Sequence, residues 1–102
     1  MDIGTVIKSI RKKKGFTQSF LAERCGITQT YLSQIESNTK EPNISTVKKI
    51  AENLEIPMPI LFFLSIDAED ITPEKQEAFK MIESSVKSLI TNFFLLNDDK
   101  HA

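Results

Sequence analysis

The side chains best suited to binding chemistry are the basic ones, and they gather in the first half of the chain. Residues 1–49 contain nine lysine or arginine side chains and four acidic ones, a net charge of +5. Residues 50–102 contain four lysines and ten acids, a net charge of −6. Such a division favours contact between the first half and a polyanion, from which the acidic half is kept away. Charge alone is equally compatible with chance segregation on a solvated surface.

Other kinds of chemistry find little support in the composition. The single cysteine, Cys25, cannot form an internal disulfide, and one cysteine and one histidine are too few for a structural zinc site. There is no nucleophile–base pair, paired carboxylate site or glycine-rich phosphate loop, so we expect no enzyme activity and no cofactor. The longest apolar run, residues 60–64, is too short to cross a membrane, and no signal peptide is recognisable. We therefore expect a cytoplasmic protein without a membrane partner.

Residues 18–35, taken with their flanks, form the most informative stretch, with the pattern of two short helices joined by a tight turn. Thr17 and Thr28 are good N-caps, and Gly26 can adopt the positive φ of such a turn. Ala22 is small where a crossing helix must come close. The apolar side chains spaced to bury one side of both helices are Leu21, Ile27, Leu32 and Ile35. This spacing is typical of a helix-turn-helix, whose protruding second helix fits the major groove of DNA.

Further helices are predicted before and after this pair. Apolar residues at positions 3, 6, 7 and 10 predict a first helix that Gly15 ends in a left-handed conformation. After a loop at 37–43, apolar positions 47, 50, 51 and 54 predict a fourth helix. Prolines at 57 and 59 fit the start of a short fifth helix that ends at Leu64. Thr72 and Pro73 predict a long last helix that ends near Asn97, before a fraying tail.

A longer series of residues at fixed offsets extends the helix-turn-helix pattern. The series comprises Ile10-Arg11-Lys12-Lys13-Lys14-Gly15-Phe16-Thr17-Gln18, Leu21-Ala22, Gly26-Ile27-Thr28-Gln29, Tyr31-Leu32-Ser33-Gln34-Ile35-Glu36, Pro42 and Ile50-Ala51-Glu52-Asn53-Leu54. In these residues the chain resembles the phage repressor/Cro (Xre) family of DNA-binding domains, from about residue 3 to residue 63. The resemblance implies an all-α fold, a compact five-helix lambda-repressor-like helix-turn-helix domain in residues 1–66. Residues 67–102, which the resemblance does not cover, would contain a long C-terminal amphipathic helix, the predicted dimerisation element, and a frayed tail.

The resemblance also implies roles for individual residues. In such domains the residue that matches Gln18 reaches a DNA phosphate, and it can brace the third helix, which is the recognition helix. Arg11 and Glu36 match a pair that is often a partly buried salt bridge. Asn38 stands where the family often has glycine, although asparagine tolerates the left-handed region. The DNA-binding residues implied are Gln18, Thr28, Gln29, Thr30, Tyr31, Ser33, Gln34, Asn38, Thr39 and Lys40.

The chemistry of the recognition helix favours particular bases. A glutamine amide can bond N6 and N7 of adenine together, whereas residues 29–36 contain no arginine or lysine for guanine. We therefore expect half-sites that contain A·T pairs. Two alternatives remain for these side chains: the polar ones could be an ordinary solvated helix face, and Tyr31 could pack instead of meeting the DNA backbone.

The last predicted helix carries an unusually regular apolar pattern. Two sets repeat every seven residues and are offset by three, as a and d positions are: Phe79, Val86 and Phe93, then Ile82, Leu89 and Leu96. This helix could fold back over its own domain or pair with a second copy. We favour the pair, because recognition of palindromic DNA needs a two-fold partner. The predicted dimerisation residues are Ile60, Phe62, Phe63, Phe79, Ile82, Val86, Leu89, Ile90 and Phe93.

These observations predict a transcriptional regulator that binds a palindromic operator in double-stranded DNA as a homodimer. Repression is favoured over activation, because occupancy alone can block polymerase. Two relatives of the same fold are alternatives, an antitoxin that also binds a toxin, and a controller of a restriction–modification system. A third alternative of another class is a protein-interaction adaptor that binds a protein partner through the last helix and does not bind DNA.

Overall fold

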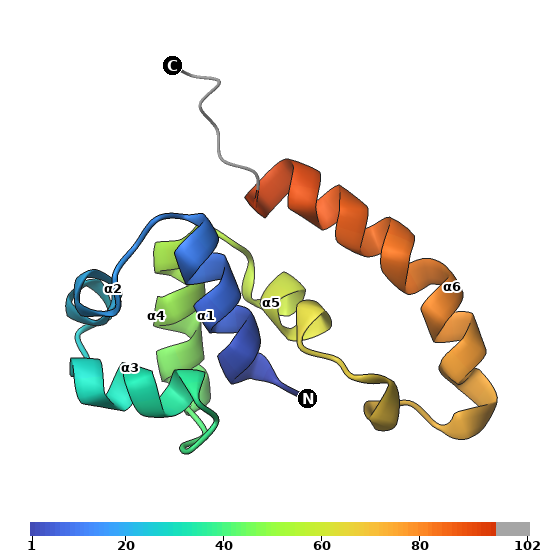
Figure 1. The fold of residues 1–102 in the computed structure, drawn as a ribbon, viewed down its shortest axis with the longest axis horizontal. Helices are drawn as coiled ribbons and strands as arrows, with labels where there is room; N and C mark the ends of the chain where they lie inside the picture. The colour runs from blue at the N-terminus through green and yellow to red at the C-terminus, as the bar shows by residue number, and fades with distance from the viewer. Residues whose placement is uncertain (96–102) are drawn as a thin grey trace.

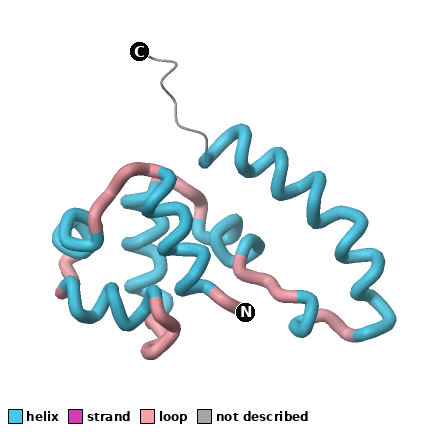
Figure 2. The backbone as a smooth tube through the Cα atoms, in the orientation of Figure 1, coloured by secondary structure: helices cyan, strands magenta, loops and turns pink. Residues whose placement is uncertain are grey.

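The computed structural model describes residues 1–95, and five short helices at its start enclose one apolar core (Figure 1). They are α1 (Ile3–Lys13), α2 (Gln18–Cys25), α3 (Gln29–Glu36), α4 (Ile44–Leu54) and α5 (Met58–Leu64). Figure 2 shows helices and loops and no strand in this described part of the chain. The predicted all-α fold class is therefore confirmed.

Side-chain caps and a glycine turn set the limits of α2 and α3. Thr17 Oγ1 accepts a hydrogen bond from the Phe20 amide at 3.0 Å, and Thr28 Oγ1 accepts one from the Tyr31 amide at 3.0 Å. Between the helices, Gly26 has φ of 70°, a left-handed conformation that costs glycine little. The two helices therefore begin where the threonines predicted, and they are joined by the predicted glycine turn.

The core draws on all five helices of this domain. Its buried side chains include Ile7, Ile10, Leu21, Leu32, Ile35, Val47, Ile50, Leu54 and Leu61. Three of the four residues predicted to bury the helix-turn-helix belong to this set, and the fourth, Ile27, is half-buried. Cys25 is also buried, and this burial raises the pKa of its thiol. A thiol kept protonated in this way suits a core residue better than a reactive one.

The chain after α5 leaves the domain and returns to it. A short 3₁₀ turn (Ala68–Asp70) precedes α6 (Pro73–Ile90), which runs along the outside of the domain (Figure 1). The predicted last helix begins where expected, but its α-helical part ends at Ile90 and widens into a π-helical turn, Thr91–Leu95. The predicted end near Asn97 and the fraying tail lie outside the described residues. No helix of the described part is long and apolar enough to cross a membrane.

The apolar residues of α6 divide between two directions. Ile90 is buried against the domain, and the ring of Phe79 lies 6.2 Å from that of Phe63 in α5. Leu89 is 56% exposed on another side of the helix. Of the predicted dimerisation residues, Ile90 is buried, Ile60, Phe62, Phe63, Phe79 and Val86 are half-buried, and Ile82, Leu89 and Phe93 are exposed. The helix therefore folds back with one side and presents the other to solvent; pairing through that side stays a prediction.

Candidate nucleic-acid interface

The recognition helix α3 is buried on one side and polar on the other. Leu32, Ile35 and Glu36 are buried, because they face the core beneath the helix. The predicted base-reading residues divide by exposure: Thr28, Gln29, Thr30 and Ser33 are exposed, while Tyr31 and Gln34 are half-buried. Tyr31 packs partly against the core, so its ring serves packing as well as the surface. The exposed side offers amide and hydroxyl groups, which are the groups that can read base edges.

Gln29 is held by the neighbouring helix. The Ser19 hydroxyl of α2 donates a hydrogen bond to Gln29 Oε1 at 2.8 Å. This bond fixes which end of the amide faces α2, and it restricts the rotamers of a flexible side chain before any ligand binds. Restricting a side chain in advance lowers the entropy that binding must later remove. The contact of Gln29 with Ser19 was not predicted, because the two residues are ten positions apart on different helices.

A buried polar network fixes α3 to α1 and α2. Arg11 Nε donates to Glu36 Oε2 at 2.7 Å, and Arg11 Nη2 donates to Glu36 Oε1 at 3.0 Å. Gln18 Nε2 donates to the same Oε1 at 2.9 Å, and Arg11 Nη1 donates to the Phe16 carbonyl at 2.8 Å. The Arg11–Glu36 pair is present as expected, and Gln18 braces the end of the recognition helix. No buried side-chain nitrogen or oxygen in residues 1–95 lacks a hydrogen-bond partner.

The loop after α3 is tied to the start of α1 through Asn38. Its Nδ2 donates to Asp2 Oδ1 at 2.7 Å, and its Oδ1 accepts from the Gly4 amide at 3.2 Å. Asn38 has φ of 61°, so asparagine fills the left-handed position that glycine often takes. Its amide is thus used inside the domain, and it also lowers the pKa of the Asp2 carboxyl. Lys40, which is exposed, carries the positive charge of this loop.

Gly4 sets the distance between α1 and the end of α3, a role that the sequence did not predict. It is buried in the first turn of α1, and a Cβ atom there would overlap the carbonyl oxygen of Ile35. Only glycine allows α1 and the end of α3 to lie this close. The single available signal was a glycine inside a predicted helix, where it ordinarily costs about 1 kcal/mol against alanine.

The exposed side of α3 and the loop that follows it form a polar surface. No group of three or more histidine, cysteine, aspartate or glutamate side chains within residues 1–95 could hold a metal ion. The helices hold in place an exposed polar face on α3 and, beside it, a loop that presents the exposed Lys40. Such a surface can donate and accept hydrogen bonds at the edges of bases and attract phosphates.

Comparison with curated proteins finds regulators and an antitoxin. The chain is 38% identical over 55 residues to the HTH-type transcriptional regulator SutR of Escherichia coli, covering 54% of this chain and 31% of SutR. It is 40% identical over 60 residues to SinR of Bacillus subtilis, covering 58% of this chain and 54% of SinR. It is 33% identical over 75 residues to the E. coli antitoxin HipB, covering 74% of this chain and 80% of HipB. The chain thus spans about a third of SutR and half of SinR.

Solved structures and a family comparison agree with this result. A crystal structure of SinR in complex with DNA is 39% identical and has a TM-score of 0.56, covering 59% of this chain and 97% of that one. A mutant of the restriction–modification controller C.Esp1396I is 33% identical with a TM-score of 0.58, covering 62% of this chain and 82% of that one. The helix-turn-helix family HTH_3 matches residues 7–61. The chain therefore belongs to the HTH_3 family of helix-turn-helix proteins, of the phage repressor (Xre) type.

Proposed function

We propose that this protein is a sequence-specific DNA-binding transcriptional regulator that acts as a homodimer on a palindromic operator, most simply as a repressor. The observation that carries this proposal is the exposed, uncharged polar face of α3 on a helix whose other side is fixed by the buried Arg11–Glu36–Gln18 network. A helix whose polar side only faces water would not need this buried network beneath it. Its similarity to SinR, which has been solved with DNA, supports the same function.

Each part of the interface has a distinct task in this proposal. Gln29, Thr30, Ser33 and Gln34 read base edges, and A·T pairs are favoured because glutamine suits adenine and α3 has no arginine for guanine. Lys40 and the exposed Lys12 near the end of α1 attract phosphates, which adds affinity that carries no sequence information. Two copies related by a two-fold axis would place their recognition helices about 34 Å apart, one turn of DNA.

The direct test is selection of bound sites from random duplex DNA, repeated at two salt concentrations. We expect a palindromic consensus, with affinity that falls steeply as salt rises, because bound lysines and arginines release counterions. The Gln29→Ala/Gln34→Ala variant should lose the consensus and keep weak nonspecific binding, since each bidentate base contact is worth about 1–3 kcal/mol. The matched control, Ser45→Ala/Glu52→Ala on the exposed side of α4, should select the same consensus. No enrichment from a folded protein would refute the regulator and favour a protein adaptor.

An antitoxin is the second candidate, and the comparison with HipB favours it specifically. This match covers 74% of the present chain and 80% of HipB, so the similarity extends past the helix-turn-helix. An antitoxin would bind its own promoter and also a toxin, so DNA selection alone does not separate the two functions. A toxin reading frame beside this gene, with a toxin that co-purifies in a defined stoichiometry, would establish the antitoxin; the absence of both would leave the regulator.

A further inference from the structure

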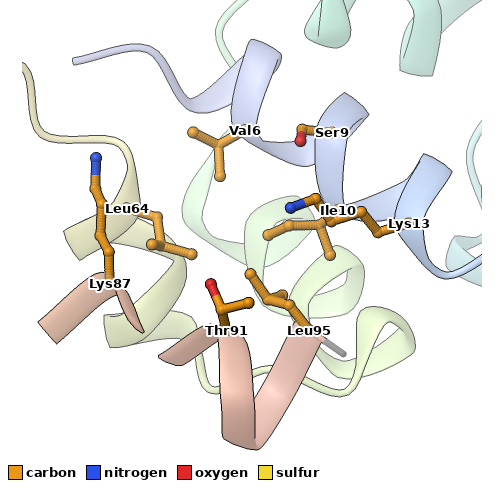
Figure 3. A pocket seen from close by; sticks show the side chains of 8 residues that line it. All are labelled: Val6, Ser9, Ile10, Lys13, Leu64, Lys87, Thr91 and Leu95. Atoms are coloured by element: carbon orange, nitrogen blue, oxygen red, sulfur yellow. The ribbon is translucent and has the colours of Figure 1, made fainter. Parts of the chain in front are cut away.

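A cavity of about 280 Å³ lies between the DNA-binding domain and the end of α6 (Figure 3). Its walls come from α1, from α5 and from the last turns of the C-terminal helix. Val6 and Ile10 of α1, Leu64 of α5 and Leu95 give it an apolar floor. A closed apolar cavity of roughly 150 Å³ already accepts benzene, so this one has room for a ligand of about ten non-hydrogen atoms.

The polar groups around the cavity are cationic or neutral. Lys13 of α1 and Lys87 of α6 stand on opposite sides of it in Figure 3, with Thr91 between them and Ser9 on the α1 side near Lys13. No carboxylate belongs to its lining. Lys87 Nζ lies 2.9 Å from Glu83 Oε2, whereas no ion pair to Lys13 is found within residues 1–95.

The π-helical turn supplies one wall of this cavity, which is open to solvent on another side. In a regular α-helix Leu95 would lie about 140° around the axis from Ile90, because each residue turns by about 100°. The π turn stacks residues five apart, so Leu95 is carried back to the side of Ile90 and is only 8% exposed. Here the wider turn supplies one wall of the cavity and places Thr91 at its edge.

We propose that this cavity binds a small anionic amphiphile, a carboxylate with an apolar tail of about eight carbons. The tail lies on Val6, Leu64 and Leu95, and the carboxylate lies between Lys13 and Lys87. Because these groups belong both to the DNA-binding domain and to α6, the ligand holds the end of α6 against the domain. This coupling rests on the proposed function: a fixed α6 sets the spacing of the two recognition helices in the dimer, so the ligand changes operator affinity.

The binding site is tested by titrating the full chain with octanoate, octanol or acetate and measuring the shifts of its methyl groups by NMR. We expect saturable shifts for octanoate at the methyl groups of Val6, Leu64 and Leu95, weaker binding of octanol, and none of acetate. Methyl groups of the exposed side of α6, such as those of Ile82 and Leu89, should not move. No saturable binding, or shifts centred on Ile82 and Leu89, would overturn the proposal, because the latter would show detergent-like adsorption.

Variants then separate the charge of the cavity from general electrostatics. Lys13→Gln/Lys87→Gln should weaken octanoate binding at least tenfold and leave octanol binding unchanged. The matched control Lys8→Gln/Lys80→Gln removes two exposed lysines that do not line the cavity, one from α1 and one from α6, and should bind octanoate like the parent protein. Equal loss in both variants would overturn the assigned site.

The coupling to DNA has its own readout. With the selected operator, saturating octanoate should change the dissociation constant at least threefold, and the Lys13→Gln/Lys87→Gln variant should show no response to octanoate. An unchanged dissociation constant with a filled cavity would refute the coupling. Absence of operator binding with or without octanoate would refute the proposed function, while the NMR experiment still decides the site.

Discussion

The five-helix domain and the C-terminal helix differ in how many helix caps and buried side chains each of them has. In the domain, four of the five helices begin with a side chain that caps the first turn, and every one contributes buried residues to one core. In α6, Thr72 makes no side-chain capping bond, and Ile90 is the only buried residue of eighteen. Contacts among its own helices stabilise the domain. By contrast, most of α6 makes few stabilising contacts with the described chain.

The residues on the exposed side of α6 indicate what kind of contact this helix lacks in the described chain. From residue 78 to residue 93, this side carries no charged residue and consists of Ala78, Met81, Ile82, Ser85, Leu89 and Phe93. The charged residues of the same span, Lys80, Glu83 and Lys87, lie on another side of the helix. A long uncharged strip with large exposed apolar groups is typical of an interface. A regular apolar pattern thus predicts a buried helix side without saying which molecule buries it.

The largest effect should come from removing Glu36 in the domain. Its carboxylate accepts hydrogen bonds from Arg11 and Gln18, and the side chains of the ion pair are 8% and 2% exposed. Glu36→Ala leaves a buried guanidinium without its partner, so we expect a loss of about 3–5 kcal/mol in urea denaturation. The matched change in α6, Glu83→Ala, breaks the surface pair with Lys87 and should cost about 0.2–0.5 kcal/mol. Similar losses would remove the distinction between the two regions.

Gly4→Ala is expected to have the next largest effect. Alanine is worth about 1 kcal/mol more than glycine inside a helix. The added Cβ would however overlap the Ile35 carbonyl oxygen, which is backbone and cannot rotate away, and such overpacking costs about 1–3 kcal/mol. We therefore expect a net destabilisation in thermal unfolding, while Thr5→Ala, exposed in the same turn, should be neutral or slightly stabilising. A stabilised Gly4→Ala variant would show that α1 and α3 can separate at little cost.

Gly4 also shows what could be predicted from the sequence. The starts of α2 and α3 were predictable, because Thr17 and Thr28 bond to residues three positions away in the chain. The contacts of Gly4 with Ile35, and of Gln18 with Glu36, join distant parts of the chain, and no local rule reports them. The resemblance to a family supplied the Arg11–Glu36 pair, which residue types alone would not have identified.

The π-helical turn after Ile90 could not be predicted for a different reason. Heptad and helical patterns assume about 3.6 residues per turn, so they extended one α-helix to residue 97. The π turn after Ile90 changes that period and turns Leu95 toward the domain. The same change created a wall of the cavity. Positions of the recognition helix were predicted better, since its exposed residues follow from the burial of Leu32 and Ile35.

Leu89→Glu tests whether the exposed side of α6 pairs with a second copy. A two-fold interface contains the substitution twice, so we expect self-association to weaken at least tenfold, about 1.4 kcal/mol, in sedimentation equilibrium. The folded fraction seen by circular dichroism should be unchanged, because Leu89 is 56% exposed. Ser84→Glu adds the same charge on a different exposed side of α6 and should leave association intact. A parent protein that stays monomeric at high concentration would contradict the dimer.

The smallest effect is expected at Asn38. Two substitutions there separate the cost of losing hydrogen bonds from the cost of a positive φ. Asn38→Ala loses the bonds to Gly4 and Asp2 and keeps an unfavourable positive φ, whereas Asn38→Gly loses the same bonds without that strain. At about 0.5–1.5 kcal/mol for a net hydrogen bond, glycine should cost about 1 kcal/mol and alanine more. Glu55→Gly is the control, because Glu55 has φ of 60° and caps α4 with its backbone, so glycine there should be neutral or stabilising.

The Asn38 variants also have a readout that general destabilisation would not move. The Asn38 amide is the main reason that the pKa of Asp2 lies below its ordinary value. A carboxyl with a lowered pKa stabilises the folded state above the ordinary aspartate pKa, and this contribution is lost as pH falls through the lowered one. Both variants should therefore raise the Asp2 pKa toward its ordinary value in an NMR titration and weaken the dependence of stability on acid pH. An unchanged Asp2 pKa would mean that the loop after α3 is not tied to α1 through this bond. The domain would then have one fewer of the long-range contacts that distinguish it from α6.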